Sequence, residues 1–135
     1  MIEVIVVMMI IGILAAVVIP KLGLPTTTST ASVDGAAYMV ASDIRYAQEF
    51  AMANRVSKSV TFTSGSSSYT SPDTGSPTYL PSGVEIGTTR TFTFNSLGEP
   101  TTGGGQTTTV TVSGSGVSRT ITVVQYTGKV NITTP

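Results

Sequence analysis

Residues 1–20 read MIEVIVVMMIIGILAAVVIP, and this stretch decides the character of the N-terminal part of the chain. It holds one carboxylate, Glu3, followed by an uncharged apolar run from Val4 to Ile19. The run is apolar on all sides, without the 3.6-residue stripe of a helix that packs against a globular core. As a helix this run spans roughly 24 Å, slightly less than a typical ~30 Å hydrocarbon core, and Met1 and Ile2 lengthen it. We therefore expect a membrane-inserted helix.

A cleavable signal peptide is the weaker interpretation of this segment. It would place Lys or Arg before the apolar run and a small-residue cleavage site after it. Here the only charge before the run is negative, and Pro20-Lys21 follow it. A carboxylate at the edge of hydrocarbon costs several kcal/mol unless it is paired, so we expect Glu3 to mark a function.

The same residues resemble a known family. The string from Ile2-Glu3-Val4 through Gly12-Ile13-Leu14-Ala15-Ala16 to Ile19-Pro20 is similar to the N-terminus of mature type IV pilins and type II secretion pseudopilins. In that family two residues, usually Phe-Thr, precede the position of Met1, and a Gly-ending leader precedes those. The resemblance therefore implies that the natural chain begins upstream of Met1. The peptidase cleavage site and the methylated N-terminal residue would then lie outside this sequence.

The resemblance implies an assembly role for Glu3. In the family the equivalent carboxylate pairs with the N-terminal amine of a neighbouring subunit, and joining two desolvated charges relieves the cost of burying each. The simpler interpretation is a peripheral Glu that reaches the lipid headgroups beside an ordinary anchor; we favour the assembly contact. The residues expected to pack in the filament core are Val4, Ile5, Val7, Ile10, Ile11, Ile13 and Leu14.

An interruption is expected after the apolar run, near residues 20–28. Pro20 and Pro25, with Gly23 between them and three threonines after, make a poor helix. The resemblance implies that the stretch from about Gly12 to Pro20 unwinds in the assembled filament. We accordingly divide the chain into a hydrophobic helical segment, 1–25, and a globular head, 29–135.

The head is predicted to open with a helix from about Thr30 to Asn54. Apolar residues recur there at alternating spacings of four and three, which forms a narrow seam, and Met39 and Phe50 are expected to widen it. Packing beneath a sheet is the favoured role of the seam, and a subunit contact is the alternative. The seam residues are Val33, Ala37, Val40, Ile44, Ala47 and Ala51.

From Ser59 onward the apolar period changes to two, which predicts strands with one buried face. Threonine suits the wet face because it is β-branched yet polar. Gly- and Ser-rich loops are expected at 64–82 and 98–106, with turns at 113–116 and 127–128. The order of a helix and then antiparallel strands predicts an α+β, pilin-like fold, and the head resembles those of H-type minor pseudopilins and related minor pilins. The predicted strands are 60–63, 91–94, 109–112, 120–124 and 129–132.

Composition excludes several classes of function. Charged residues are 10% of the 135 residues and the net charge is zero, so no basic patch can attract nucleic acid. Ser and Thr together number 40, which favours an exposed extracellular surface. The chain has no Cys, so the disulfide that closes the C-terminal loop in many pilins is absent.

No catalytic, metal or cofactor site is predicted. Asp73-Thr74-Gly75 matches the triplet of aspartic proteases, but prolines on both sides favour a turn. Gly128-Lys129 lacks the rest of a phosphate-binding loop and is expected to be a hairpin turn. With no His or Cys, zinc and Ser/His or Cys/His chemistry are not available, and the carboxylates are too scattered to hold calcium.

Modification is a separate possibility. Asn131-Ile132-Thr133 is a glycosylation sequon, a tripeptide that also occurs by chance. We rate O-linked decoration of the Ser/Thr-rich loops above modification of Asn131.

These observations favour a structural subunit of a type IV pilus-like extracellular filament, held in the inner membrane as a precursor. The expected partners are identical subunits and, by resemblance, a prepilin peptidase, a platform protein and an ATPase motor. One alternative is a minor pseudopilin of a type II secretion system. Another is a membrane-anchored extracellular binding module, and an enzyme is the least favoured class.

Overall fold

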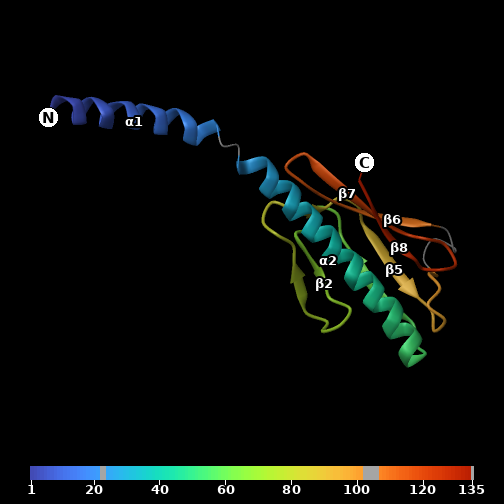
Figure 1. Cartoon of the computed structure of the whole chain (residues 1–135). Helices are drawn as coiled ribbons and strands as arrows, with labels where there is room; N and C mark the ends of the chain where they lie inside the picture. The colour runs from blue at the N-terminus through green and yellow to red at the C-terminus, as the bar shows by residue number, and fades with distance from the viewer. Residues whose placement is uncertain (22–23, 102–106, 135) are drawn as a thin grey trace.

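The computed structural model describes residues 1–21, 24–101 and 107–134. Helix α1 (Ile2–Lys21) comes first, and α2 (Leu24–Asn54) follows it. Eight short strands follow within the described residues (Figure 1). They are β1 (Lys58–Phe62), β2 (Ser68–Thr70), β3 (Pro77–Tyr79), β4 (Glu85–Ile86), β5 (Arg90–Phe94), β6 (Thr108–Gly114), β7 (Val117–Val123) and β8 (Val130–Thr133).

Both described helices extend into the range 20–28 in which the sequence predicts an interruption. Helix α1 keeps Gly12 and Pro20 and ends only at Lys21, while α2 already begins at Leu24, six residues before the predicted Thr30. Pro25 is the second residue of α2, where a backbone N–H has no helical acceptor, so its missing donor costs the helix nothing. The prediction that the break extends through Thr28 is therefore wrong. Gly23 lies outside the described residues.

The end of α2 agrees with the prediction and has a defined cap. The helix stops at Asn54, and Arg55 takes a left-handed conformation with φ 54°. The N–H of Val56 then donates to the carbonyl of Ala51 at 3.2 Å. This bond is the one that closes a Schellman motif, here with arginine in the position that glycine usually holds.

The strand pairs among the described residues are antiparallel and form three sheets. The four-stranded sheet has the order β4-β6-β7-β8, and two-stranded sheets pair β1 with β5 and β2 with β3. Strands β1, β5, β6, β7 and β8 confirm the five predicted from alternation. Strands β2, β3 and β4 are additional, and two of them lie in the segment 64–82 that was predicted as a loop.

The strand connections confirm the predicted turns. Ser115 and Gly116 both have positive φ, 51° and 79°, which gives the tight β6–β7 hairpin the twist that its strands require. Asp73-Thr74-Gly75 lies in the β2–β3 turn, where Gly75 N–H donates to the Ser71 carbonyl at 3.0 Å. Lys129 follows the β7–β8 turn, and its carbonyl accepts from Val124 N–H at 2.9 Å.

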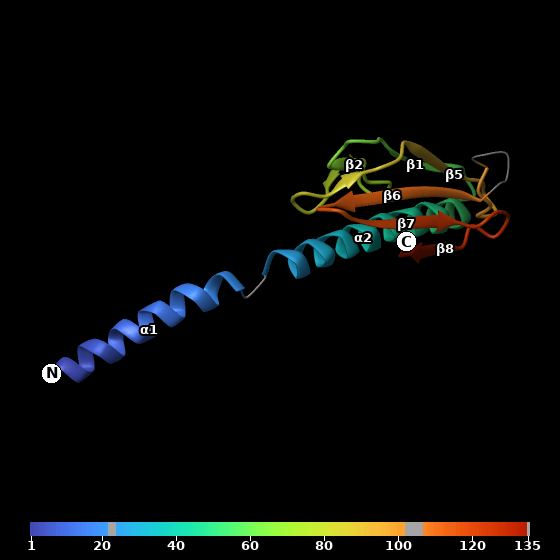
Figure 2. The same ribbon diagram turned by 90° about the horizontal axis from the view of Figure 1, so that it is seen from above.

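The core of the head lies between α2 and the sheets. Helix α2 contacts β1, β5, β6, β7 and β8, and Figure 2 shows these strands running alongside it. All six residues of the predicted seam are fully buried. Met39 is 36% exposed, however, so the prediction that it widens the buried face is wrong; Ala36 and Ala41 take that place. The largest fully buried strand residues of the core are Phe62, Phe92, Phe94, Ile86 and Ile121.

The opposite face of the β1–β5 pair is polar, as the alternation predicts. Ser59 pairs with Thr93 and Thr61 with Thr91, through hydroxyl–hydroxyl hydrogen bonds of 2.9 and 3.0 Å. Cross-strand pairs of this kind stabilise a sheet while leaving it wettable. The head is therefore complete without α1, which projects away from it in both ribbon views.

Candidate functional site

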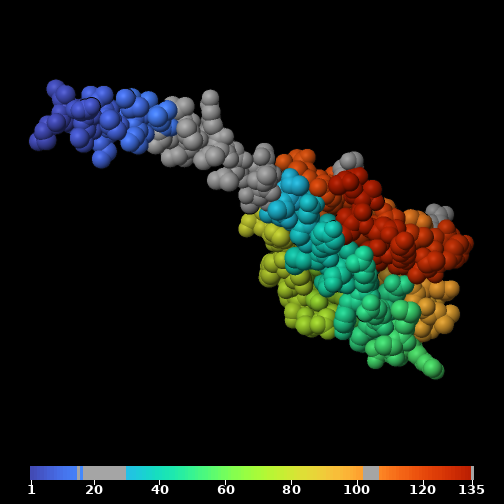
Figure 3. All heavy atoms as spheres, in the orientation of Figure 1, coloured from blue at the N-terminus to red at the C-terminus, as the bar shows by residue number. Residues whose placement is uncertain are grey.

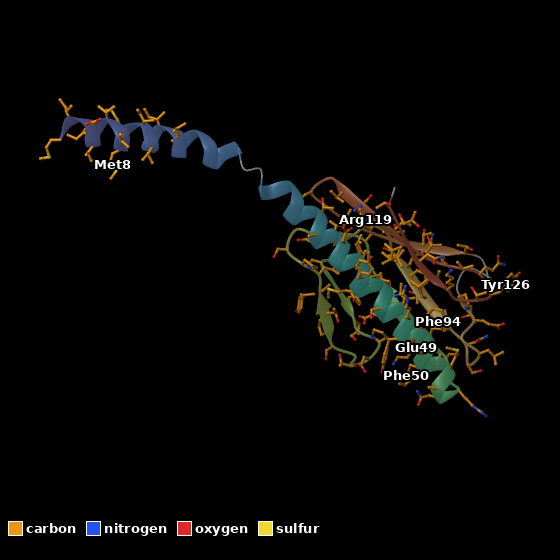
Figure 4. All side chains as sticks on the ribbon, viewed as in Figure 1. Met8, Glu49, Phe50, Phe94, Arg119 and Tyr126 are labelled. Atoms are coloured by element: carbon orange, nitrogen blue, oxygen red, sulfur yellow. The ribbon has the colours of Figure 1, made fainter. Side chains whose placement is uncertain are left out.

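The described side chains of α1 from Ile2 to Leu14 are exposed. The seven residues predicted for a filament core are between 50% exposed, at Val7, and 65% exposed, at Ile5. Because successive helical residues turn by about 100°, these seven positions surround the helix rather than form one stripe. Figure 3 shows the described atoms of α1 standing apart from those of the head, and Figure 4 shows Met8 projecting where no other element lies.

An exposed apolar surface of this extent has a physical consequence. Monomeric soluble proteins rarely expose contiguous apolar patches larger than a few hundred Å², and larger ones mark interaction sites. Burying one Val, Leu or Ile side chain stabilises an assembly by about 1.5–3 kcal/mol. The α1 surface, defined as the side chains of Val4 to Leu14, therefore favours any surroundings that remove it from water.

Glu3 stands in the first turn of α1, beside the α1 surface. The positive end of the helix dipole favours a carboxylate at this position. Within the part of the chain that the structure describes, the Glu3 carboxylate takes part in no ion pair. Its charge is thus available to a cation from outside this chain, and its role as an assembly contact stays a prediction.

A set of polar contacts fixes α2 against the four-stranded sheet. Arg119 of β7 forms an ion pair with Asp34, with Nε 2.6 Å from the carboxylate oxygen. Further along α2, the Arg45 guanidinium donates to the Val130 carbonyl of β8 at 3.1 Å. Gln48 Nε2 donates to the carbonyls of Gly98 and Thr127, at 2.8 and 3.0 Å, and so connects two turns that no disulfide joins.

Two tyrosine–carboxylate hydrogen bonds fix α2 against the β2–β3 hairpin. Tyr69 of β2 donates to Asp43 of α2, and Tyr46 of α2 donates to Asp73 of the turn, both at 2.8 Å. Burial and the Asp43 hydrogen bond raise the pKa of the Tyr69 phenol above its ordinary value. The hydrogen bond to Asp73 raises the pKa of the exposed Tyr46 phenol in the same direction.

Neither contact was predicted from the sequence. The sequence analysis assigned Asp73 to a turn and gave Asp43 no role. Asp43 and Tyr69 are 26 residues apart in the sequence, and Tyr46 and Asp73 are 27 apart. The one available signal was Tyr69 itself, a large aromatic residue within a Ser- and Gly-rich segment.

The described ranges of the chain hold no cluster of metal-ligating side chains. No group of three or more His, Cys, Asp or Glu side chains comes together there to hold a metal ion. Asn131 lies half-buried on β8, opposite Thr122 of β7. Its modification, like that of the Ser/Thr-rich loops, stays a prediction.

A helix that crosses a membrane needs about 20 consecutive, predominantly apolar residues. Of the residues that the structure describes, no helical stretch combines the length and the apolarity needed to cross a bilayer.

Comparison with known proteins gives a structural likeness. No protein-family model and no curated protein matches the sequence. The fold is similar to two crystal forms of the type IV minor pilin FimU of Pseudomonas aeruginosa (strain PAO1), at 14% sequence identity in each case. One match has a TM-score of 0.55 and covers 74% of this chain and 91% of FimU. The other has a TM-score of 0.56 and covers 81% and 92%. The chain therefore has a pilin-like α+β fold, as the sequence predicted.

Proposed function

We propose that the protein is a structural subunit of a type IV pilus-like extracellular filament. The observation that carries this proposal is the α1 surface, which is apolar on all sides, exposed, and attached to a head that is already folded without it. Copies of the chain supply the same surface to one another, so α1 helices packed side by side would remove it from water. The likeness to FimU supports a pilus-related role.

Glu3 is proposed as the contact that sets the axial position of neighbouring subunits. Apolar surfaces attract without direction, so α1 helices could slide past one another at little cost. A carboxylate at one end of α1 changes this, because in an apolar core it must meet a cation. We propose that this cation is the N-terminal amine of the neighbouring subunit.

We also propose where the subunit resides and which proteins assemble it. The apolar run Val4–Ile19 would hold the precursor in the inner membrane before assembly, and the Ser/Thr-rich head would face outward on the filament. A prepilin peptidase, a platform protein and an ATPase motor would process and assemble it, as in the family that the N-terminus resembles. The stretch from Gly12 to Pro20 is helical in the isolated chain, and unwinding there would belong to the assembled state.

Substitution of Glu3 tests the proposal. We expect Glu3→Ala to remove or strongly reduce filaments sheared from the cell surface, as seen by electron microscopy, while the subunit still accumulates in the membrane fraction. Glu49→Ala is the matched control, because Glu49 is an exposed carboxylate on α2. Normal filament yield from Glu3→Ala would contradict the proposal and favour a membrane-anchored binding module, which does not need the contact.

A minor subunit is the second candidate, favoured by the description of FimU as a minor pilin. Deletion of the gene separates the candidates. Loss of long surface fibres supports an abundant subunit, whereas few but otherwise normal fibres support a minor one. A secretion defect without loss of fibres would instead indicate a pseudopilin of a type II secretion system.

A further inference from the structure

An open hollow of about 430 Å³ lies between the outer face of α2 and the β2–β3 hairpin. Its volume falls within the range of small-molecule sites, about 300–1,000 Å³. The α2 side provides Tyr38, Met39, Ser42 and Asp43, and the hairpin provides Tyr69 and Thr78. In Figure 1 the α2 and β2 ribbons run beside each other along this boundary.

The carboxylate in this hollow has a fixed position. Asp43 accepts the 2.8 Å hydrogen bond from Tyr69, a side chain only 5% exposed. The ring of Tyr69 packs against Phe62, with centroids 4.9 Å apart, so the donor is anchored in the core. A carboxylate accepts at about four lone-pair sites, so this bond leaves most of the acceptor capacity of Asp43 to a ligand.

The apolar wall of the hollow faces solvent. Tyr38 is 66% exposed and Met39 36%, both on the outer face of α2. Gly35 leaves open space beside them, since a Cβ added there would have no atom within 4 Å. A single exposed tyrosine is ordinary, but here the ring stands next to an oriented carboxylate and the Ser42 and Thr78 hydroxyls.

We propose that this hollow binds a neutral sugar residue of an oligosaccharide. A sugar ring presents an apolar C–H face and a rim of hydroxyl donors. Tyr38 and Met39 fit the face, and Asp43 fits two adjacent hydroxyls through charge-assisted hydrogen bonds. No Lys or Arg lines the hollow, which disfavours phosphate and other anions.

The lining of a second hollow indicates the length of the ligand. Tyr38 also lines a smaller hollow of about 240 Å³, together with Arg119 and Thr134. Because Tyr38 lines both hollows, a chain of sugars long enough to enter both would contact it in each. Binding should therefore strengthen from a disaccharide to a tetrasaccharide. This inference is independent of filament assembly, because every residue it uses lies in the head.

Calorimetric titration of the full chain tests the proposal. The protein is kept in a zwitterionic detergent without a sugar headgroup, which would otherwise compete. The probes are tetrasaccharides of glucose, galactose, mannose, N-acetylglucosamine and, as a charged comparison, glucosamine. We expect at least one neutral probe to bind, and both Tyr38→Ala and Asp43→Asn to weaken it about tenfold or more. Tyr126→Ala is the matched control, because Tyr126 is 70% exposed on the β7–β8 turn, and it should change nothing.

Several outcomes would overturn the proposal. One is that no neutral probe binds. Another is a clear preference for the glucosamine tetrasaccharide, which would indicate a cation site. A third is an equal loss of binding from Tyr38→Ala and Tyr126→Ala. Asp43→Asn keeps an acceptor for Tyr69, so its effect on binding is readable as long as its unfolding midpoint matches that of the unsubstituted protein.

Discussion

The two helices of this chain solve the same problem in different ways. Helix α2 carries a narrow apolar seam, and the sheets of its own head bury it completely. Helix α1 is apolar all round, and its described side chains from Val4 to Leu14 remain at least half exposed. A helix needs a partner for each apolar face. Helix α2 therefore has its partner within the chain, whereas the described part of α1 needs one outside it.

The largest expected effect is a difference between the two helices in how much a large-to-small substitution lowers the stability of the head. Ile44→Ala, in the seam of α2, should lower the free energy of unfolding of the head by about 2–5 kcal/mol, because it leaves a cavity. Ile10→Ala, on α1, should change it by less than about 0.5 kcal/mol, because Ile10 is 51% exposed on a helix whose described atoms stand apart from the head. Urea unfolding of the full chain, followed by tyrosine fluorescence, measures both. Equal losses would mean that α1 supports the folded head, and would contradict the distinction between the two helices.

A second substitution sharpens the description of the seam. Ala47 is fully buried where α2 meets the sheets, so Ala47→Leu should overpack the core and destabilise the head by about 1–3 kcal/mol. Ala53→Leu adds the same group to an exposed position of the same helix and should stay within about 0.5 kcal/mol of the unsubstituted protein. The same urea unfolding experiment applies. A neutral Ala47→Leu would show that the seam is loosely packed.

The smallest effect concerns pH. Folding raises the pKa of Tyr69 above its ordinary value of 10.0, so the unfolded chain loses this proton first as the pH rises. The stability due to Tyr69 is therefore complete below pH 10 and declines above it, by at most about 1.4 kcal/mol per pH unit. Tyr69→Phe should be less sensitive between pH 10 and 11 than the unsubstituted protein, in unfolding curves measured at each pH. Identical pH dependence would mean that Tyr69 is neither buried nor hydrogen-bonded to Asp43 in solution.

The sequence predicted those parts of the fold that depend on periodicity. The seam from Val33 to Ala51 and five strands follow from spacing alone, because burial selects every third or fourth residue of a helix and every second residue of a strand. The start of α2 could not be read in this way. Pro25 and the threonines after it have low helix propensity, yet the first turn of a helix tolerates proline.

Contacts between residues far apart in the chain could not be predicted from the sequence. Strands β2 and β3 have loop-like composition, and Tyr69 is the one residue of β2 that is buried. The hydrogen bond from Tyr69 to Asp43, and with it the hollow beside α2, depends on how the hairpin folds back onto the helix. Glu3 is the opposite case. The sequence identifies it as a candidate, and the partner proposed for it belongs to another copy.

Cross-linking of α1 tests the central claim, that copies of this chain bury one another's α1 surface. The chain has no cysteine, so each single substitution from Val4 to Leu14 introduces a unique thiol. Thiols join only when two Cα atoms come within about 7 Å. Mild oxidation of the extracellular fraction should give disulfide-linked dimers at several of these positions, recurring with helical spacing, while Tyr126→Cys on the head gives few. Monomers at every α1 position would contradict the account.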